Sequence, residues 1–372
     1  MTSLGRAVGQ LLTVGFDGAS PPPDLRARLR ASEVGGVMLF RPNIEAPPQV
    51  SSLVTALREA EPTDAPVLVA VDQEGGLVQR LRAPLTVWPD MLSVGAAGNP
   101  ERTFAVGRGL GAELAALGIG WDFAPVLDVH TNPENPVIGN RAFGTTPGAV
   151  TTHALAFWRG LRAAGLVGCG KHFPGHGDTR TDSHLDLPIV DHEVARLRRI
   201  ELAPFAAAAA AGMESIMTAH VMYPALDPDW PATLSRRILT DLLRNELGFA
   251  GVIVSDDLGM KAVADRYPME ELAVRAVAAG VDVLLIREPA DRQREAYEAL
   301  VRAAEQSATL RARVMESAAR VRGMKAACAV ALPAPAVDLA SRLGTASHRE
   351  LAASFALVDP RSPVAASPVV DA

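Results

Sequence analysis

Residues 167–188 of the chain read V-G-C-G-K-H-F-P-G-H-G-D-T-R-T-D-S-H-L-D-L-P. The first four residues are small and mostly apolar, which is typical of a buried strand. Lys171 and His172 end this strand, and the glycines and prolines that follow predict a polar loop. Three of the eight histidines of the chain fall in this stretch. Because a rigid strand that carries a loop of titratable side chains is a common support for catalysis, we expect an active site here.

The same succession of an apolar run and a helical pattern recurs along the chain. Several runs are apolar almost throughout, as parallel strands covered on both faces are. We expect strands at residues 11–17, 36–40, 67–72, 119–128, 167–172, 215–220, 251–256 and 281–286. We expect helices at residues 47–60, 100–117, 147–164, 193–211, 235–247, 269–279, 290–304 and 309–324. Many of these helices end at a glycine, a common C-terminal stop.

Eight strand–helix units predict an α/β fold, a single (β/α)8 barrel of the TIM type. An open, doubly wound sheet is the alternative, but no G-x-G-x-x-G motif follows the first strand, which weakens it. We expect the barrel domain, with a C-terminal helix, to span residues 1–325. Residues 326–372, rich in Ala and Pro, form a tail that we expect to be partly disordered or to lie outside the barrel.

The composition is that of an ordinary globular protein, with 48% hydrophobic and 21% charged residues among 372. The net charge of −6 argues against nucleic acid as a partner. The sequence begins without a signal-peptide pattern and has no stretch long enough to span a membrane, so we expect a cytoplasmic protein. Its two cysteines, Cys169 and Cys328, should be reduced thiols. We expect a monomer that requires no metal and no other cofactor.

Polar residues follow five of the predicted strands, at the end where barrels of this type build their active sites. They are Asp72, Glu74 and Arg80, then Asp128 and Arg141, Lys171 and His172, His220, and Asp256 and Asp257. Each alone could be a helix cap, a structural ion pair or a buried histidine. Together they favour a site for a polyhydroxylated ligand, because sugar hydroxyls require charged hydrogen-bond partners.

The same rim carries residues suited to cleaving a glycosidic bond. Hydrolysis of this bond requires two carboxylates, or a carboxylate and a proton donor, on either side of it. Asp256 could be the nucleophile. Asp182 and His184 are two residues apart, so on an extended segment their side chains point the same way and can touch. Histidine titrates near neutral pH and can act first as an acid and then as a base.

These motifs resemble those of a known family. K-H-F-P-G-H-G at residues 171–177, with D-S-H at 182–184, is similar to the signature of family 3 glycoside hydrolases of the β-N-acetylhexosaminidase branch. D-Q-E-G-G at 72–76, R-A-F-G at 141–144 and S-D-D at 255–257 resemble its other blocks, in the same order. The resemblance covers residues 11–288 and implies an exo-acting, retaining β-N-acetylglucosaminidase.

The resemblance also implies roles for individual residues. Asp256 matches the nucleophile that forms a covalent glycosyl-enzyme, and His184 matches the acid/base, with Asp182 as its orienting partner. The positions that hold the N-acetylglucosamine unit are matched by Asp72, Arg80, Arg141, Lys171 and His172.

Three neighbouring features are interpreted from their position in these motifs. We interpret Asp257 as a structural carboxylate. His176, which lies between two glycines, is expected to shape the loop rather than to contact the substrate. Because the acid/base lies on a loop, we expect residues 173–186 to be mobile and to close over the sugar.

A chain with neither a signal peptide nor a second domain resembles the cytoplasmic enzymes of peptidoglycan recycling. Those enzymes remove N-acetylglucosamine from N-acetylglucosaminyl-1,6-anhydro-N-acetylmuramic acid and its peptides. The β-glucosidase members of the family carry their acid/base glutamate on a second domain, for which the sequence leaves no room after residue 288.

Three alternatives remain open. A phosphorylase could use the same residues, because a histidine acid/base does not repel an incoming phosphate. A metal-dependent barrel hydrolase could use His172, His176, His184 and Asp182, although no H-x-H motif ends the first strand. An inactive sugar-binding protein is the third, and the presence of the complete set of catalytic residues argues against it.

Overall fold

The computed structural model describes residues 3–60, 66–180, 187–287, 289–329 and 333–357. Within them, eight strands form one parallel sheet in the order β10-β1-β2-β3-β6-β7-β8-β9. A parallel bridge between Val254 and Val283 links the two ends of the sheet and closes the barrel. The strands are β1 (Leu12–Val14), β2 (Gly36–Leu39), β3 (Leu68–Val71), β6 (Trp121–Asp122), β7 (Val167–Phe173), β8 (Ser215–Thr218), β9 (Val252–Val254) and β10 (Leu284–Ile286).

The predicted (β/α)8 barrel is therefore confirmed, with all eight strands in the expected order. The largest difference concerns β6, which has two residues where a run at 119–128 was predicted. Pro125 lies within that run, and proline has no N–H to donate to a neighbouring strand. The chain beyond β6 stays beside β7, with one parallel bridge between Val126 and Lys171.

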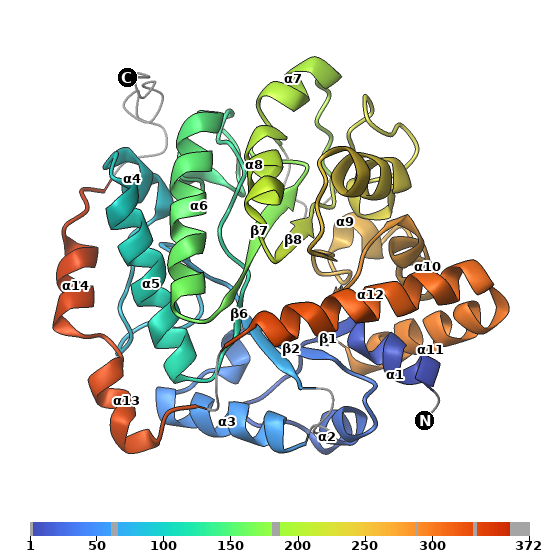
Figure 1. The fold of residues 1–372 in the computed structure, drawn as a ribbon, viewed down its shortest axis with the longest axis horizontal. Helices are drawn as coiled ribbons and strands as arrows, with labels where there is room; N and C mark the ends of the chain where they lie inside the picture. The colour runs from blue at the N-terminus through green and yellow to red at the C-terminus, as the bar shows by residue number, and fades with distance from the viewer. Residues whose placement is uncertain (1–2, 61–65, 181–186, 288, 330–332, 358–372) are drawn as a thin grey trace.

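Helices surround the barrel (Figure 1). They are α1 (Ser3–Gln10), α2 (Pro23–Arg30), α3 (Pro47–Glu59), α4 (Met91–Ala96), α5 (Pro100–Ala116), α6 (Pro147–Ala163), α7 (Val194–Arg199), α8 (Ala203–Ala211), the π-helix η4 (Arg237–Glu246), α9 (Lys261–Ala264), α10 (Met269–Ala279), α11 (Ala290–Gln306) and α12 (Ala308–Ala327). Three 3₁₀ turns, η1 (Arg41–Asn43), η2 (Gly139–Arg141) and η3 (Ala232–Leu234), lie in the loops.

The prediction of one helix over residues 193–211 was wrong. The chain leaves helical geometry after α7 and starts again at α8, whose second residue is Pro204. A proline inside a helix removes one hydrogen bond and clashes with the preceding turn, so a continuous helix could not pass through this position.

The interior of the barrel is apolar and closed at one end. Met38, Trp121, Phe123 and Met217 belong to the cluster that fills it, and α12 adds Val321 and Met324 to the same cluster. Lys325 of α12 donates a 2.7 Å hydrogen bond to the carbonyl of Gly35, just before β2. Helix α12 therefore covers the amino-terminal ends of the strands and leaves the carboxyl ends open for a site.

The described part of residues 326–372 lies outside the barrel, as expected. Helix α13 (Ala336–Arg342) packs on α3 and α5, and α14 (Ala346–Ala353) packs on α5 (Figure 1). The buried carboxylate of Glu113 in α5 accepts hydrogen bonds from the Gly344 amide at 2.8 Å and from His348 Nδ1 at 3.0 Å. The expected disorder concerns residues 330–332 and 358–372, which lie outside the described residues.

Two other expectations concern single residues and helix length. Cys169 and Cys328 are both free thiols, and burial raises the pKa of Cys169 to about 12. Among the described helices, none combines the length and the apolar character that crossing a membrane requires.

Candidate active site

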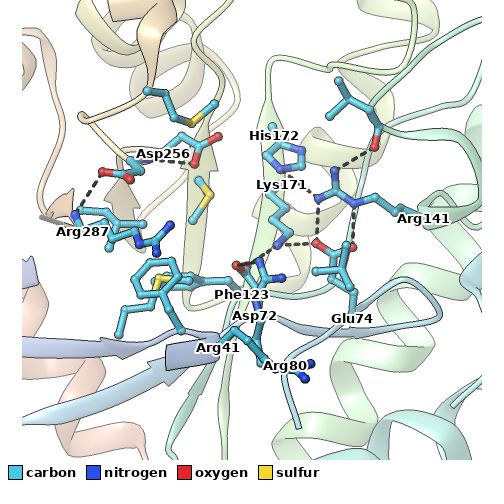
Figure 2. A pocket seen from close by; sticks show the side chains of 18 of the residues that line it. Arg41, Asp72, Glu74, Arg80, Phe123, Arg141, Lys171, His172, Asp256 and Arg287 are labelled. Carbon is cyan, nitrogen blue, oxygen red and sulfur yellow. Dashed lines mark hydrogen bonds and ion pairs between the residues drawn. The ribbon is translucent and has the colours of Figure 1, made fainter. Parts of the chain in front are cut away.

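A pocket of about 320 Å³ lies at the carboxyl ends of the barrel strands (Figure 2). Six of the residues proposed from the sequence line it, namely Asp72, Arg80, Arg141, Lys171, His172 and Asp256. Asp182 and His184, the proposed acid/base pair, lie outside the described residues, as do the other residues of 181–186 in the loop that was expected to move. The structure thus brings together every predicted site residue that it describes.

Lys171 stands at the centre of a buried ionic cluster. Its ammonium lies 2.9 Å from Asp72 Oδ1 and 2.6 Å from Glu74 Oε1, and its side chain is only 2% exposed. Arg80 contacts the other oxygen of Asp72 at 3.1 Å. Arg141 donates two hydrogen bonds of 2.8 Å to Glu74, the bidentate geometry in which guanidinium–carboxylate pairs are strongest. This cluster forms one wall of the pocket.

The charges in this cluster stabilise one another. Burial alone would raise the pKa of Glu74, but the adjacent Arg141 and Lys171 outweigh it and hold that pKa well below its usual range. Burial would lower the pKa of Lys171, yet Asp72 and Glu74 keep it above its ordinary value. The lysine therefore stays a cation and can donate hydrogen bonds to a ligand at neutral pH.

A short hairpin presents this cluster to the pocket. Its strands are β4 (Gln73–Gly75) and β5 (Val78–Gln79), which the sequence analysis did not predict. Gly76 at its turn has a φ of 58°, and a Cβ there would lie 2.8 Å from atoms of Asp90, so a glycine is required. The Gln73 side chain bonds both the amide and the carbonyl of Leu81, which fixes the segment between Glu74 and Arg80.

Asp128 organises the two histidines beside this cluster. Its Oδ2 lies 2.7 Å from His172 Nδ1, and its oxygens accept the backbone amides of His172 and His176. His172 Nε2 lies 3.5 Å from a nitrogen of Arg141, which can only donate. His172 must therefore donate from Nδ1 to Asp128 while Nε2 faces Arg141. Asp128 is fully buried, and its hydrogen bonds hold both histidines where they line the pocket.

His176 is 2% exposed, and its Nδ1 lies 2.7 Å from Thr179 Oγ1. Its carbonyl accepts a hydrogen bond from Asn135, and next to it Gly177 approaches the chain so closely that a Cβ there would lie 1.8 Å from the carbonyl of Val129. These contacts hold residues 174–180 against the loop after β6. They are what a loop-shaping role for His176 requires, although His176 also lines the pocket.

Burial, together with the neighbouring His172, lowers the pKa of His176 to about 4. The pKa of this histidine is about 6.5 in an unfolded chain and about 4 in the folded protein. Its contribution to the free energy of unfolding is therefore fully present above pH 6.5 and is lost as the pH falls toward 4. We expect this histidine to cost about 3 kcal/mol of unfolding free energy by pH 4. Urea unfolding of wild type and His176→Gln at pH 7.5, 5.5 and 4.5 would check this. An equal decrease of the unfolding free energy with falling pH in both proteins would contradict it.

Asp256 lies across the pocket from the ionic cluster, after β9 (Figure 2). One of its oxygens accepts the backbone amide of Asp257 at 2.8 Å, and the side chain is partly exposed to the pocket. Asp257 instead accepts the amides of Gly259 and Arg287, so its carboxylate ties the loop after β9 to the end of β10. Burial raises the pKa of Asp257. These contacts match the structural role expected for it.

The sequence analysis did not assign four charged residues to the site. Glu74 and Asp128 were noted at strand ends but given no role, since the sequence does not reveal which charges pair. Arg41 and Arg287 also line the pocket. Arg41 lies two residues after β2 and Arg287 directly follows β10, so the rule that placed the other residues at strand ends would have found them. Among the described residues, no group of three His, Cys, Asp or Glu side chains is arranged to hold a metal ion.

Comparisons with known proteins identify the family of the chain. The profile of the "Glycosyl hydrolase family 3 N terminal domain" matches residues 3–324. A curated "Beta-hexosaminidase A" of Pseudoalteromonas piscicida is 40% identical over 367 residues, which is 90% of this chain and 60% of that protein. The chain thus spans less than two thirds of this relative's length.

Two solved structures are also similar. The family 3 β-N-acetylglucosaminidase of Paenibacillus sp. str. FPU-7 has a TM-score of 0.88 and 41% identity, covering 95% of this chain and 68% of that one. NagZ from Neisseria gonorrhoeae, solved in complex with N-trifluoroacetyl-D-glucosamine, has a TM-score of 0.71 and 32% identity, covering 84% and 98%. By sequence and fold, the chain belongs to glycosyl hydrolase family 3 and is a homologue of its β-hexosaminidases.

Proposed function

We propose that the protein is a retaining β-N-acetylglucosaminidase that removes terminal, β-linked N-acetylglucosamine. The observation that carries the proposal is the position of Asp256 opposite the ionic cluster of Lys171, Glu74 and Arg141 in one pocket. The pocket is at the small end of the range for ligand sites, which suits a single sugar ring. The N-acylglucosamine ligand of the Neisseria structure supports the same sugar class.

In the proposed first step, Asp256 attacks the anomeric carbon as the bond to the leaving oxygen breaks. His184, oriented by Asp182, gives its proton to that oxygen. In the second step, the neutral imidazole takes a proton from water, the water oxygen attacks the anomeric carbon, and Asp256 leaves as a carboxylate. Two displacements at the same carbon return the original β configuration.

The ionic cluster and His172 would bind the sugar during this reaction. Lys171 and Arg141 offer donors to the hydroxyl groups of the sugar, and Asp72 and Nε2 of His172 offer acceptors. All four are held in place by partners before a ligand arrives, so little ordering is needed when the sugar binds.

The biological setting is a further part of the proposal. We infer a cytoplasmic, monomeric enzyme of peptidoglycan recycling that acts on N-acetylglucosaminyl-1,6-anhydro-N-acetylmuramic acid and its peptides. The motif resemblance at residues 171–184 supports this setting. Fractionation of the native host and sedimentation of the purified protein would test location and oligomeric state.

The activity is tested by release of p-nitrophenol from its β-N-acetylglucosaminide, in buffer with and without phosphate. We expect hydrolysis to free N-acetylglucosamine at a rate independent of phosphate. A sugar 1-phosphate as the main product would show a phosphorylase. No release from this substrate, combined with release from the β-glucoside, would contradict the proposed specificity.

A further inference from the structure

The loop that carries Asp256 contacts the end of β10. Within the described part of the barrel, a single β-bridge joins β9 to β10, between Val254 and Val283. Nearer the pocket, the N–H of Arg287 donates to Asp257 at 3.1 Å, and the N–H of Asp257 donates to Asp256 at 2.8 Å. Asp256 and Arg287 accordingly lie on the same side of the pocket (Figure 2). The position of the backbone at Arg287 therefore influences where the carboxylate of Asp256 lies.

The side chain of Gln293 in α11 holds this end of β10, and it is only 2% exposed. Its Nε2 donates to the carbonyls of Gly15 and Arg287, both at 2.9 Å, and to that of Ile286 at 3.2 Å. Gly15 follows β1, the strand beside β10, and a Cβ there would lie 2.7 Å from the carbonyl oxygen of Arg287. One amide group therefore fastens the ends of two neighbouring strands together at the rim of the pocket.

The oxygen of the same amide faces a buried arginine. Nη1 of Arg28 in α2 donates a 2.7 Å hydrogen bond to Oε1 of Gln293. A guanidinium can only donate and a carbonyl can only accept, so the amide of Gln293 has one possible orientation. Arg28 is 5% exposed, and its Nε and Nη2 have no hydrogen-bond partner among the described residues. Burial of a cation with unpaired donors costs stability, so this arrangement calls for an explanation other than stability.

We propose that Gln293, oriented by Arg28, is a positioning residue for Asp256. The carbonyl of Arg287 accepts a hydrogen bond from Gln293, and the N–H of Arg287 donates to Asp257. The N–H of Asp257 in turn donates to the carboxylate of Asp256. The proposal rests on the proposed function, in which Asp256 attacks the anomeric carbon. Gln293 and Arg28 are not among the residues that line the active-site pocket, so both act through the loop rather than on the sugar.

The test separates the rate of the reaction from the binding of the sugar. Gln293→Met should lower kcat on the p-nitrophenyl β-N-acetylglucosaminide about 10–100-fold, since misplacement of a reacting group by about 1 Å can cost about 100-fold. The inhibition constant of N-acetylglucosamine should change less than about threefold, because the ionic cluster of Asp72, Lys171 and Arg141 keeps its partners. A loss of structure alone would not separate these two quantities.

A double variant keeps the test independent of folding. Arg28→Met with Gln293→Met replaces both polar partners by apolar side chains of similar length, so no buried cation remains there. Its unfolding midpoint should therefore lie closer to wild type than that of Gln293→Met alone. Its kcat should nevertheless stay as low as that of Gln293→Met, because the donor to the carbonyl of Arg287 is still missing.

The opposite end of the barrel offers a matched control. There, Lys325 donates a 2.7 Å hydrogen bond to Oε1 of Gln10, so a second buried cation is paired with a glutamine. Gln10→Met with Lys325→Met removes this pair from the amino-terminal ends of the strands. We expect this variant to lose stability but to keep kcat within about twofold of wild type, because the pair is not linked to Asp256.

Three results would overturn the proposal. Wild-type kcat in the Arg28→Met, Gln293→Met variant would show that Asp256 is positioned without this pair. Equal changes of kcat and of the inhibition constant in Gln293→Met would indicate a general disturbance of the pocket. An equal loss of kcat in the Gln10→Met, Lys325→Met control would show that any buried polar pair has this effect. Absence of p-nitrophenol release from wild type would instead contradict the proposed function, and with it this role.

Discussion

Asp256→Ala should lose about 10⁴-fold or more in kcat on the p-nitrophenyl β-N-acetylglucosaminide. Without this carboxylate no group attacks the anomeric carbon, and removal of a nucleophile costs more than removal of any single binding contact. Folding should be little affected, because the side chain is partly exposed and, among the described residues, accepts a hydrogen bond from the neighbouring amide of Asp257. Steady-state kinetics and thermal unfolding of the purified variant would measure both effects.

The neighbouring aspartate provides the matched control. Asp257→Asn keeps an oxygen that can accept the amides of Gly259 and Arg287, so its loss of activity should be about 10-fold at most. Azide should rescue Asp256→Ala, since a small anion can occupy the space of the lost carboxylate, attack the anomeric carbon and release p-nitrophenolate. The product should be the α-glycosyl azide. Equal losses in both variants, or full activity in Asp256→Ala, would exclude Asp256 as the nucleophile.

Lys171→Met should be the most damaging change to stability in the site. It leaves Asp72 and Glu74 next to each other without the ammonium that bridges them at 2.9 and 2.6 Å. Breaking a buried ion pair costs up to about 3–5 kcal/mol, and in this variant Asp72 and Glu74 keep only Arg80 and Arg141 to compensate their charges. The variant should also lose most of its activity, since Lys171 lines the sugar pocket. Denaturant unfolding and the kinetic assay would quantify the two losses.

The pH dependence of this loss is a specific consequence. In wild type, Lys171 helps to hold the pKa values of Asp72 and Glu74 below their usual range, so their stabilising contribution is present at neutral pH and disappears as the pH falls below about 4. The variant lacks this contribution, so its deficit relative to wild type should stay constant from pH 7 to about pH 5 and shrink as the pH falls from about 4 toward 2. Lys261→Met removes an exposed lysine of α9 and should change stability by less than about 0.5 kcal/mol. A deficit that is independent of pH would contradict the ionic account.

The strands and the rim of the barrel could be predicted because their signal is local. Each strand is a short apolar run, and the polar residues that follow it share one end of the barrel whatever the details of packing. Asp72, Lys171 and Asp256 were found in this way. The same rule extends to Arg41 and Arg287, whose positions just after β2 and β10 place them at the same rim.

Pairings between distant residues could not be predicted. Glu74 lies 67 residues from Arg141 in the sequence, and Asp128 lies 44 residues from His172, so only the folded chain brings them together. The hairpin of β4 and β5 has only two or three residues per strand, too few for a period to be recognised. The break after α7 was detectable in principle, because Pro204 interrupts the apparent helix.

The identity of the nucleophile is tested most directly by trapping the glycosyl-enzyme. Wild-type protein would be incubated with a fluorinated N-acetylglucosaminyl donor that forms the intermediate faster than water releases it, then digested and analysed by mass spectrometry. We predict that one fluorinated N-acetylglucosaminyl unit is added to the peptide that contains Asp256, and that Asp256→Ala is not labelled. Labelling of a different residue, or a first product with the α configuration, would contradict the account.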